Sequence, residues 1–433
     1  MDAAAAEIDD VAHAHTRTPV PEADTVPGFQ VGLVCIGIAI TLPGLYTGGE
    51  IARGLGLGEG MVAVLVAALL LSIMSVPSGI VGVRTRLTSY LIVEHVFGAQ
   101  GARLVNLVFG IVLLGWYAVT AELFGRTLAL AAADLGGPDL PEWLWTVTSS
   151  ALVIFTAIYG FRALDRLALF AVPLLTLFLA LFVARALGDT SLGDLLAIEG
   201  EGMAFTDGVS ILIGAMITNV VLMPDLTRYA RTDRDAFVAA FLGNGGGIAI
   251  STILAMIPAL ALGAIDPMVW FGLLGVGLLA LVVLVFATWT TNGVNLYSTG
   301  LVAGCALPQF SYVRIILASG VLGTALALWG VADRLTDFLI LLGLVVPPVA
   351  GVYLTRYFLL GARDFSEAHL EARPAVDVPA LVAAAVAGGV STVAWFSEIT
   401  LTGIPSVEAL LLAGVLVWGL DRVFPGAEEG AAS

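Results

Sequence analysis

Four polar side chains lie within an apolar stretch of the chain that could not easily tolerate them unpartnered. Residues 267–307 contain no charged side chain, yet the stretch includes Thr290, Thr291, Asn292 and Asn295. Because a helical span of lipid needs only ~20 residues, these groups are expected near membrane depth. A polar group persists there when it bonds a neighbouring helix, an ion or a solute. The residue types therefore leave two interpretations open: hydrogen bonding between helices, or a binding site.

Two other segments combine polar residues with residues that interrupt helices. Residues 41–49 read Thr-Leu-Pro-Gly-Leu-Tyr-Thr-Gly-Gly, and residues 214–225 carry Gly214, Thr218, Asn219 and then Met-Pro-Asp. Proline removes a helix hydrogen bond, and glycine tolerates unwound backbone. Interrupted helices at matching positions of two inverted halves are typical of a transporter substrate site. Proline kinks without a ligand are the alternative.

The composition places these segments in a membrane protein. The 433 residues are 59% hydrophobic and only 12% charged, with mean hydropathy +1.00, whereas soluble domains carry about 25% charged residues. The net charge is -16 and every basic residue is arginine, so no basic patch for nucleic acid is expected. The chain contains no P-loop, H-E-x-x-H or G-x-S-x-G string, which argues against a primary pump or a membrane hydrolase. We therefore expect no enzymatic activity and no cofactor.

Apolar runs of span length predict twelve transmembrane helices. They fall near residues 29–51, 60–83, 102–131, 143–161, 166–186, 208–227, 235–263, 275–303, 312–331, 336–358, 378–395 and 403–423. With this count, fourteen of the eighteen arginines fall on one side, which the positive-inside rule makes cytoplasmic. Both termini are then cytoplasmic, and the protein is expected in the plasma membrane.

The two interrupted spans, one and six, are five spans apart and so cross the membrane in opposite senses. This predicts an all-α fold of two inverted five-helix repeats with two appended helices, which is the leucine-transporter fold. We expect a tail at 1–26, a transport core at 27–360, and a final segment at 361–433 with spans eleven and twelve. That fold often holds a cation between the unwound part of span one and span eight, where Thr290 and Thr291 supply hydroxyls.

Six strings in order resemble the nucleobase–cation symporter family, and most closely its cytosine permease branch. They are Tyr46-Thr47-Gly48-Gly49, the run from Gly82 to Tyr90, Gly115-Trp116-Tyr117, the run from Asp225 to Arg231, Trp289-Thr290-Thr291-Asn292 with Asn295-Leu296-Tyr297, and the run from Pro347 to Val352. Each string alone is weak, but six in register over roughly 40–360 are specific.

The resemblance implies uptake of a flat heterocycle by cation symport with alternating access. In the family an aromatic residue of span three stacks on the ring, here Trp116, and a polar residue of span six bonds its edge, here Thr218. The remaining residues implied to line the substrate site are Thr41, Leu113, Met216 and Asn292. The resemblance also implies a sodium site formed by backbone oxygens of Gly37, Ile40 and Ala287 and by the hydroxyls of Thr290 and Thr291.

Three positions depart from the family pattern. Leu113 replaces an amide, Met216 replaces a second aromatic face, and Thr41 replaces an aromatic residue in the span-one break. The pocket should therefore prefer a substituted pyrimidine, a uracil-like base or a hydantoin over cytosine. An amino-acid or amine symporter on the same fold, and proton-coupled nucleobase uptake, are the alternatives.

Charged residues near the membrane have structural interpretations. Glu122 and Arg126 are spaced i, i+4 on span three and can pair. Asp225 lies beside Arg228 and Arg231 and favours a cytoplasmic structural contact. Trp116 itself could be a packing residue as readily as a stacking surface.

Overall fold

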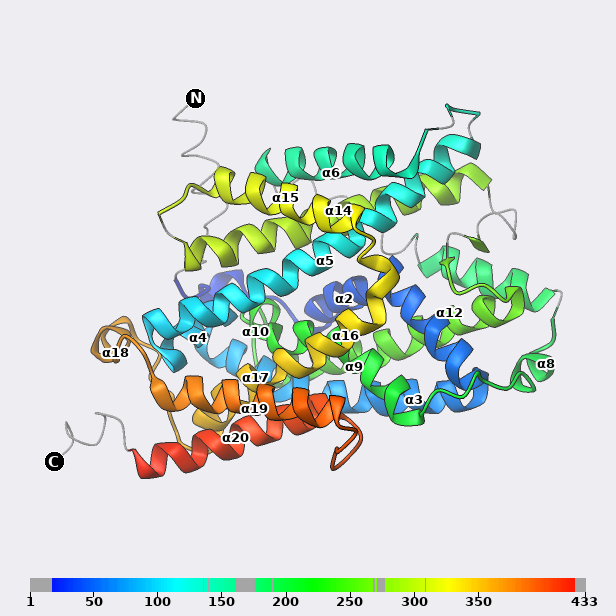
Figure 1. Cartoon of the computed structure of the whole chain (residues 1–433). Coiled ribbons are helices and arrows are strands. Elements are labelled where there is room, and N and C mark those ends of the chain that lie inside the picture. Colours follow the sequence, from blue (N-terminus) through cyan, green and yellow to red (C-terminus); the bar gives the residue numbers. More distant parts are fainter. Residues whose placement is uncertain are drawn as a thin grey trace.

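The computed structural model describes residues 18–134, 136–138, 140–159, 174, 176–188, 190–267, 269–270, 277–307 and 309–424. Within those ranges the protein is helical, and β-type pairing is confined to two isolated bridges, Val26–Ala230 and Gly56–Glu199. Figure 1 shows long helices packed side by side over the length of the molecule.

The helices follow one another with few long connections. The first half contains α2 (Gly28–Ala39), α3 (Leu42–Thr85), α4 (Ser89–Phe97), α5 (Ala99–Asp134), α6 (Glu142–Tyr159), α8 (Leu192–Leu196), α9 (Phe205–Val221) and α10 (Met223–Thr227). The second half contains α11 (Asp233–Ala240), the π-helix η2 (Phe241–Gly247), α12 (Ile248–Leu262), α14 (Gly277–Ala306), α15 (Tyr312–Leu328), α16 (Leu335–Val345), α17 (Pro347–Phe358), α18 (Glu367–Ala372), α19 (Val378–Phe396) and α20 (Pro405–Val423). The short turns η1 (Glu22–Asp24) and η3 (Ala332–Arg334) and an apolar helix at Thr176–Gly188 are also described.

Several of these helices are suited to a bilayer. Among the described residues, five helical stretches are long and apolar enough to cross a membrane by length and composition: Leu42–Thr85, Ala99–Leu130, Asp233–Leu262, Ala332–Phe358 and Val378–Phe396. Shorter apolar helices include Glu142–Ile158, Phe205–Val221 and Tyr312–Leu328. The chain is therefore a multi-pass membrane protein.

The helix that begins the core is interrupted between α2 and α3. Ile40 (φ -92°, ψ 76°) and Thr41 (φ -128°, ψ 161°) leave helical geometry, and the Thr41 hydroxyl accepts a hydrogen bond from Gly44 N at 3.4 Å. Pro43 falls in the first turn of α3, where its missing N–H removes no helix bond. Further on, Gly56 (φ 74°, ψ 179°) turns α3 sharply, as Figure 1 shows. The turn expected between spans one and two is thus a single glycine with a positive φ.

The sixth predicted span is interrupted later than its polar residues suggest. Helix α9 is regular through 214–219, and the chain leaves it at Leu222 (φ -92°, ψ 12°) before α10. Hydroxyls from other helices bind the carbonyls at its end: Ser78 Oγ donates to Val220 O at 2.8 Å, and Tyr353 OH donates to Val221 O at 3.1 Å. The interruption is therefore capped by the protein's own side chains.

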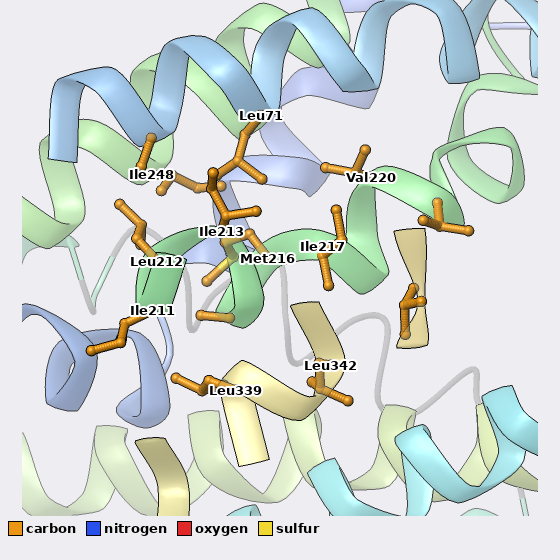
Figure 2. Close-up of a cluster of buried hydrophobic side chains, with 14 of the residues drawn as sticks. Leu71, Ile211, Leu212, Ile213, Met216, Ile217, Val220, Ile248, Leu339 and Leu342 are labelled. Atoms are coloured by element: carbon orange, nitrogen blue, oxygen red, sulfur yellow. The ribbon is translucent and has the colours of Figure 1, made fainter. Parts of the chain in front are cut away.

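The buried side chains of the described residues form three hydrophobic clusters, and α5 lies between the two larger ones. The largest cluster includes residues of α3, α9, α12 and α16, and Figure 2 shows α9 side chains packed between Leu71 and Ile248 on one side and Leu339 on the other. A second cluster joins α5, α6, α14 and α15 around the fully buried Tyr117. Trp116 packs against the first cluster and the next residue, Tyr117, belongs to the second, so α5 presents different faces to the two clusters.

Candidate substrate and ion site

Trp116 presents an aromatic surface on the face of α5 that meets α16. Its ring is half-buried and contacts Phe338 edge to face, with centroids 5.5 Å apart and an interplanar angle of 79°. A Cβ added at Gly115 would lie 2.5 Å from the Phe338 ring, so the glycine permits this close approach. An edge-to-face contact leaves one face of an indole ring open to another planar group.

Thr218 on α9 carries a buried hydroxyl that bonds none of the described groups. The residue is 6% exposed, and its Oγ1 has no hydrogen-bond partner among the described residues. Other buried threonines bond the carbonyl one turn earlier, as Thr47 does to Pro43 O at 2.8 Å and Thr227 to Met223 O at 3.0 Å. Leaving a buried hydroxyl unsatisfied costs about 1–3 kcal/mol. The orphaned group is therefore a candidate to bind a ligand.

Helix α16 contacts both of these helices. Gly214, one turn before Thr218, lies directly against the carbonyl of Leu339, the neighbour of the Phe338 that meets Trp116. The backbone of α9 can approach α16 so closely because residue 214 has no side chain. Phe338 was not predicted from the sequence, since only the packing of α16 against α5 reveals it.

Two residues predicted to line the pocket are part of the hydrophobic core. Leu113 is 7% exposed and Met216 is 5% exposed, and both belong to the largest cluster. Asn219 Nδ2 lies 3.8 Å from Met216 Sδ. Thr41, which was also predicted to line the substrate site, caps α3 with its hydroxyl.

The two asparagines of α14 bind α5. Asn292 is fully buried, and in the amide orientation that satisfies both its groups it donates to Tyr117 O at 3.1 Å and accepts from Ala121 N at 3.2 Å. Asn295 Nδ2 donates to Thr120 Oγ1 at 3.4 Å. Backbone groups one turn apart match the donor and acceptor of an amide, so Asn292 bonds the neighbouring helix α5 through both of its amide groups. Asn292 and Asn295 therefore form hydrogen bonds between helices, which is the first of the two interpretations of the polar stretch.

The predicted ion ligands come from two segments. Gly37 is in the last turn of α2, and Ile40, 5% exposed, is at the interruption that follows. Thr291 is half-buried on α14, whereas the side chains of Ala287 and Thr290 lie outside the described residues. In the described part of the chain, no three His, Cys, Asp or Glu side chains gather to hold a metal ion.

A cluster of side-chain ion pairs lies near η3. The predicted pair of Glu122 and Arg126 is confirmed, with Arg126 Nη2 and Glu122 Oε1 at 2.6 Å. The same arginine also pairs with Glu142 and Asp333, and Glu122 Oε2 accepts from Ala332 N at 2.8 Å. The buried carboxylate thus ties α5 to η3.

Asp225 has a structural contact of a kind that the sequence did not predict. Its carboxylate accepts from Ser89 N at 2.7 Å, at the start of α4, and a negative charge is stabilised at a helix N-terminus. Arg228 Nε donates to the main-chain oxygen of Asp225 at 3.3 Å. Two of the six strings that carried the resemblance are thereby joined in space.

An interrupted first helix in a membrane protein whose described residues are helical is typical of solute transporters. A profile of the family described as "Permease for cytosine/purines, uracil, thiamine, allantoin" matches residues 33–413. The chain belongs to this family of permeases, whose members are transporters and not enzymes.

Individual relatives agree with this assignment. The chain is 30% identical to the cytosine permease of Escherichia coli (strain K12) over 406 residues, which covers 92% of this chain and 91% of that protein. It is 24% identical to the hydantoin permease of Microbacterium maritypicum, covering 79% and 75%. The structure of Mhp1, a nucleobase-cation-symport-1 family transporter in a closed conformation with bromovinylhydantoin bound, superposes with a TM-score of 0.79 at 23% identity, covering 95% and 96%. The fold of this chain is therefore that of Mhp1.

Proposed function

We propose that this protein imports a neutral, planar heterocycle of the nucleobase or hydantoin type by secondary active transport. The observation that carries the proposal is the unpartnered hydroxyl of Thr218 on a helix that shares α16 with the aromatic surface of Trp116. A flat heterocycle needs an aromatic surface for its face and a hydrogen-bonding group for its edge. Relatives described as cytosine and hydantoin permeases support this class of substrate.

The substrate is inferred to be less polar than cytosine. Leu113 stands where cytosine permeases carry an amide, and Met216 stands where they carry a second aromatic residue. Both side chains pack in the largest hydrophobic cluster. Asn292 binds the backbone of α5. A substituted pyrimidine, a uracil-like base or a hydantoin, without the exocyclic amino group of cytosine to satisfy, suits such a pocket better.

Sodium is proposed as the coupling ion. Its ligands would be the carbonyls of Gly37, Ile40 and Ala287 and the hydroxyls of Thr290 and Thr291, since hard cations prefer oxygen ligands and freed backbone carbonyls at an interrupted helix supply them. An ion held there would order the junction between α2 and α3. Because that junction also lines the proposed pocket, ion and solute should bind cooperatively.

The proposed membrane topology has twelve spans, as two inverted sets of five followed by two more. The core then comprises 27–360, preceded by a tail at 1–26 and followed by 361–433. Both termini are placed in the cytoplasm and the protein in the plasma membrane, supported by the fourteen of eighteen arginines that this topology puts on one side.

A thermal-shift screen of purified protein tests the substrate and the ion together. Nucleobases and hydantoins are added in sodium chloride and in choline chloride, and we expect one class of heterocycle to raise the unfolding temperature more in sodium. The Thr291→Ala variant should lose the difference between the two salts. The Thr299→Ala variant is the control, because the Thr299 hydroxyl bonds Asn295 O within α14 at 2.8 Å.

The outcomes of this screen separate the two parts of the proposal. No stabilisation by any heterocycle in either salt would contradict the substrate class and favour an amino acid or an amine. Equal stabilisation in both salts would retain the heterocycle and replace sodium with a proton.

A further inference from the structure

Gly115 and Glu122 lie on the same face of α5, where that helix meets η3 and α16. The two residues are seven positions apart, which places them on one side of a helix and about 10 Å apart along its axis. Gly115 faces the ring of Phe338, and Glu122 Oε2 accepts from Ala332 N at 2.8 Å. The segment from η3 into α16 therefore runs along this face of α5 in the opposite direction, from the ion pairs towards the candidate site.

Helix α16 meets α9 and α5 in different ways. The carbonyl of Leu339 lies against Gly214 of α9, which is a contact between two backbones. On the α5 side, the Phe338 ring contacts Gly115 and Trp116. A ring can turn about its side-chain torsions, whereas a contact between backbones cannot adjust in this way. Packing at the site therefore places α16 relative to α9 but determines its distance from α5 less strictly.

The hydrogen bond from Ala332 N to Glu122 supplies a constraint that the aromatic contact lacks. It joins the backbone of η3 to α5, and η3 continues directly into α16 at Leu335. Glu122 is 4% exposed and Ala332 is 7% exposed, so water competes little for either group. Hydrogen bonds to a charged acceptor are stronger than those between neutral groups, and burial strengthens them further. Glu122 is thus placed to hold the start of α16 at a set distance from α5.

The arginine beside Glu122 depends on this carboxylate less than Ala332 does. Arg126 also pairs with Glu142 at 3.0 Å and with Asp333 at 2.8 Å, and both of these carboxylates are exposed. Loss of the Glu122 carboxylate would leave Arg126 with two partners, but it would leave Ala332 N without the acceptor that the structure gives it. Substitution can therefore separate the ion pair of Glu122 from its hydrogen bond to the backbone.

We propose that Glu122 is a positioning residue of the transport site, which fixes α16 through its hydrogen bond to Ala332 N. The position of α16 in turn sets the distance between Trp116 on α5 and Thr218 on α9, because α16 is packed against the α9 backbone. Groups that bind one ligand must be held within about 0.5 Å of their productive geometry by supporting residues. The inference rests on the proposed function, since it takes Trp116 and Thr218 to bind the same solute.

Binding measurements on variants of Glu122 test this role. Heterocycle affinity is measured by calorimetry on purified protein, whose fold is checked by its unfolding temperature. Glu122→Leu removes the acceptor and should weaken binding about tenfold. Glu122→Gln keeps a carbonyl oxygen that can accept from Ala332 N, so its affinity should stay within about threefold of the wild type. Glu142→Leu is the matched control, because Glu142 pairs with the same arginine but has no described bond to η3; its affinity should not change.

A double-mutant cycle with Thr218 distinguishes positioning from a general effect on the fold. In a Thr218→Val background the contact with the solute edge is already absent, so Glu122→Leu should weaken binding by less than about twofold more. Distant substitutions that act independently would instead give the same loss in both backgrounds. A tenfold loss in both backgrounds would therefore overturn the proposal. So would unchanged affinity of Glu122→Leu, or equal losses in Glu122→Leu and Glu122→Gln.

Hydrogen exchange tests the link between Glu122 and α16 without a solute. The amides of residues 332–338 should exchange about tenfold faster in Glu122→Leu than in the wild type, whereas Glu142→Leu should match the wild type. Unchanged exchange in Glu122→Leu, or an equal effect of Glu142→Leu, would contradict the proposal. If exchange rises as expected in a protein that binds no heterocycle, the proposed function fails, whereas the placement of α16 by Glu122 stands.

Discussion

Helices α14 and α9 both carry polar side chains within apolar sequence, but they use them differently. On α14, Asn292 is fully buried and both amide groups are bonded to the backbone of α5. On α9, Thr218 is nearly as buried and its hydroxyl has no described partner. The comparison shows that burial of a polar group at membrane depth does not identify a binding site, whereas the lack of a partner points to one.

The free energies involved explain why both arrangements persist. Hydrogen bonds between membrane helices average about 0.6 kcal/mol and reach about 1–2 kcal/mol, so the α14 contacts stabilise packing modestly. An unsatisfied buried hydroxyl costs about 1–3 kcal/mol, which a bound solute would offset. The first arrangement contributes to the fold, and the second makes the empty protein less stable than it could be.

The largest effect is expected for substitution of Trp116, which packs against the same cluster as α9. Trp116→Ala should weaken heterocycle binding by about ten- to a hundredfold, because base–aromatic stacking is worth about 1–3 kcal/mol. Trp116→Phe should lose less. Affinity is measured by calorimetry on folded protein, with Tyr117→Phe as the control because Tyr117 belongs to the second cluster. Equal losses in Trp116→Ala and Tyr117→Phe would mean that both residues serve packing.

Removing the amide of α14 should affect stability and not binding. Asn292→Ala deletes two bonds to α5 in a buried place, and we expect a loss of about 1–3 kcal/mol in the free energy of unfolding. Heterocycle affinity of the protein that remains folded should be unchanged. If the Asn292→Ala variant has normal stability but binds the heterocycle tenfold more weakly, Asn292 contacts the substrate and is not a packing residue.

The hydroxyl of α9 should show the opposite pattern. Thr218→Val removes an unpartnered group at constant shape, so the unfolding temperature should stay the same or rise, while affinity falls by about tenfold. Thr218→Ser keeps the hydroxyl and should retain most of the affinity. If the valine variant binds as the wild type does, another group meets the substrate edge.

The smallest expected effect tests whether every unpartnered polar atom marks a site. His95 on α4 is 5% exposed and its Nδ1 has no described partner, but its ring contacts Phe365 edge to face at 5.0 Å and stacks on His369 at 6.2 Å. Burial, together with nearby His369 and Arg373, lowers the pKa of His95 to about 4, against a weaker opposing effect of Asp364. In the unfolded chain His95 takes up a proton below about pH 6.5, whereas in the folded protein it does so only near pH 4. The folded state therefore loses stability as the pH falls from about 6.5 towards 4. The unfolding temperature of wild type should therefore drop between pH 7 and pH 5 by more than that of His95→Gln. Identical pH profiles would show that His95 is not the group that titrates.

Part of the candidate site follows from the sequence because it depends on residue type and order. Composition and span-length runs determine a multi-pass helical protein, since lipid accepts only helices or closed barrels with satisfied backbones. The six strings in register between about 40 and 360 indicate the permease family. The i, i+4 spacing of Glu122 and Arg126 predicts their pairing because the geometry of one helix decides it.

Only the tertiary structure decides which groups meet across helices. Asn292 and Thr218 are both polar residues in apolar sequence, but α5 presents two backbone groups to the Asn292 amide, whereas no described group bonds the Thr218 hydroxyl. The interruption of span six lies at Leu222 rather than among its polar residues, because Ser78 and Tyr353 from distant parts of the chain bind the carbonyls at the end of α9. The pairing of α2 with α11 likewise joins segments about 200 residues apart, and no local propensity encodes a contact over that separation.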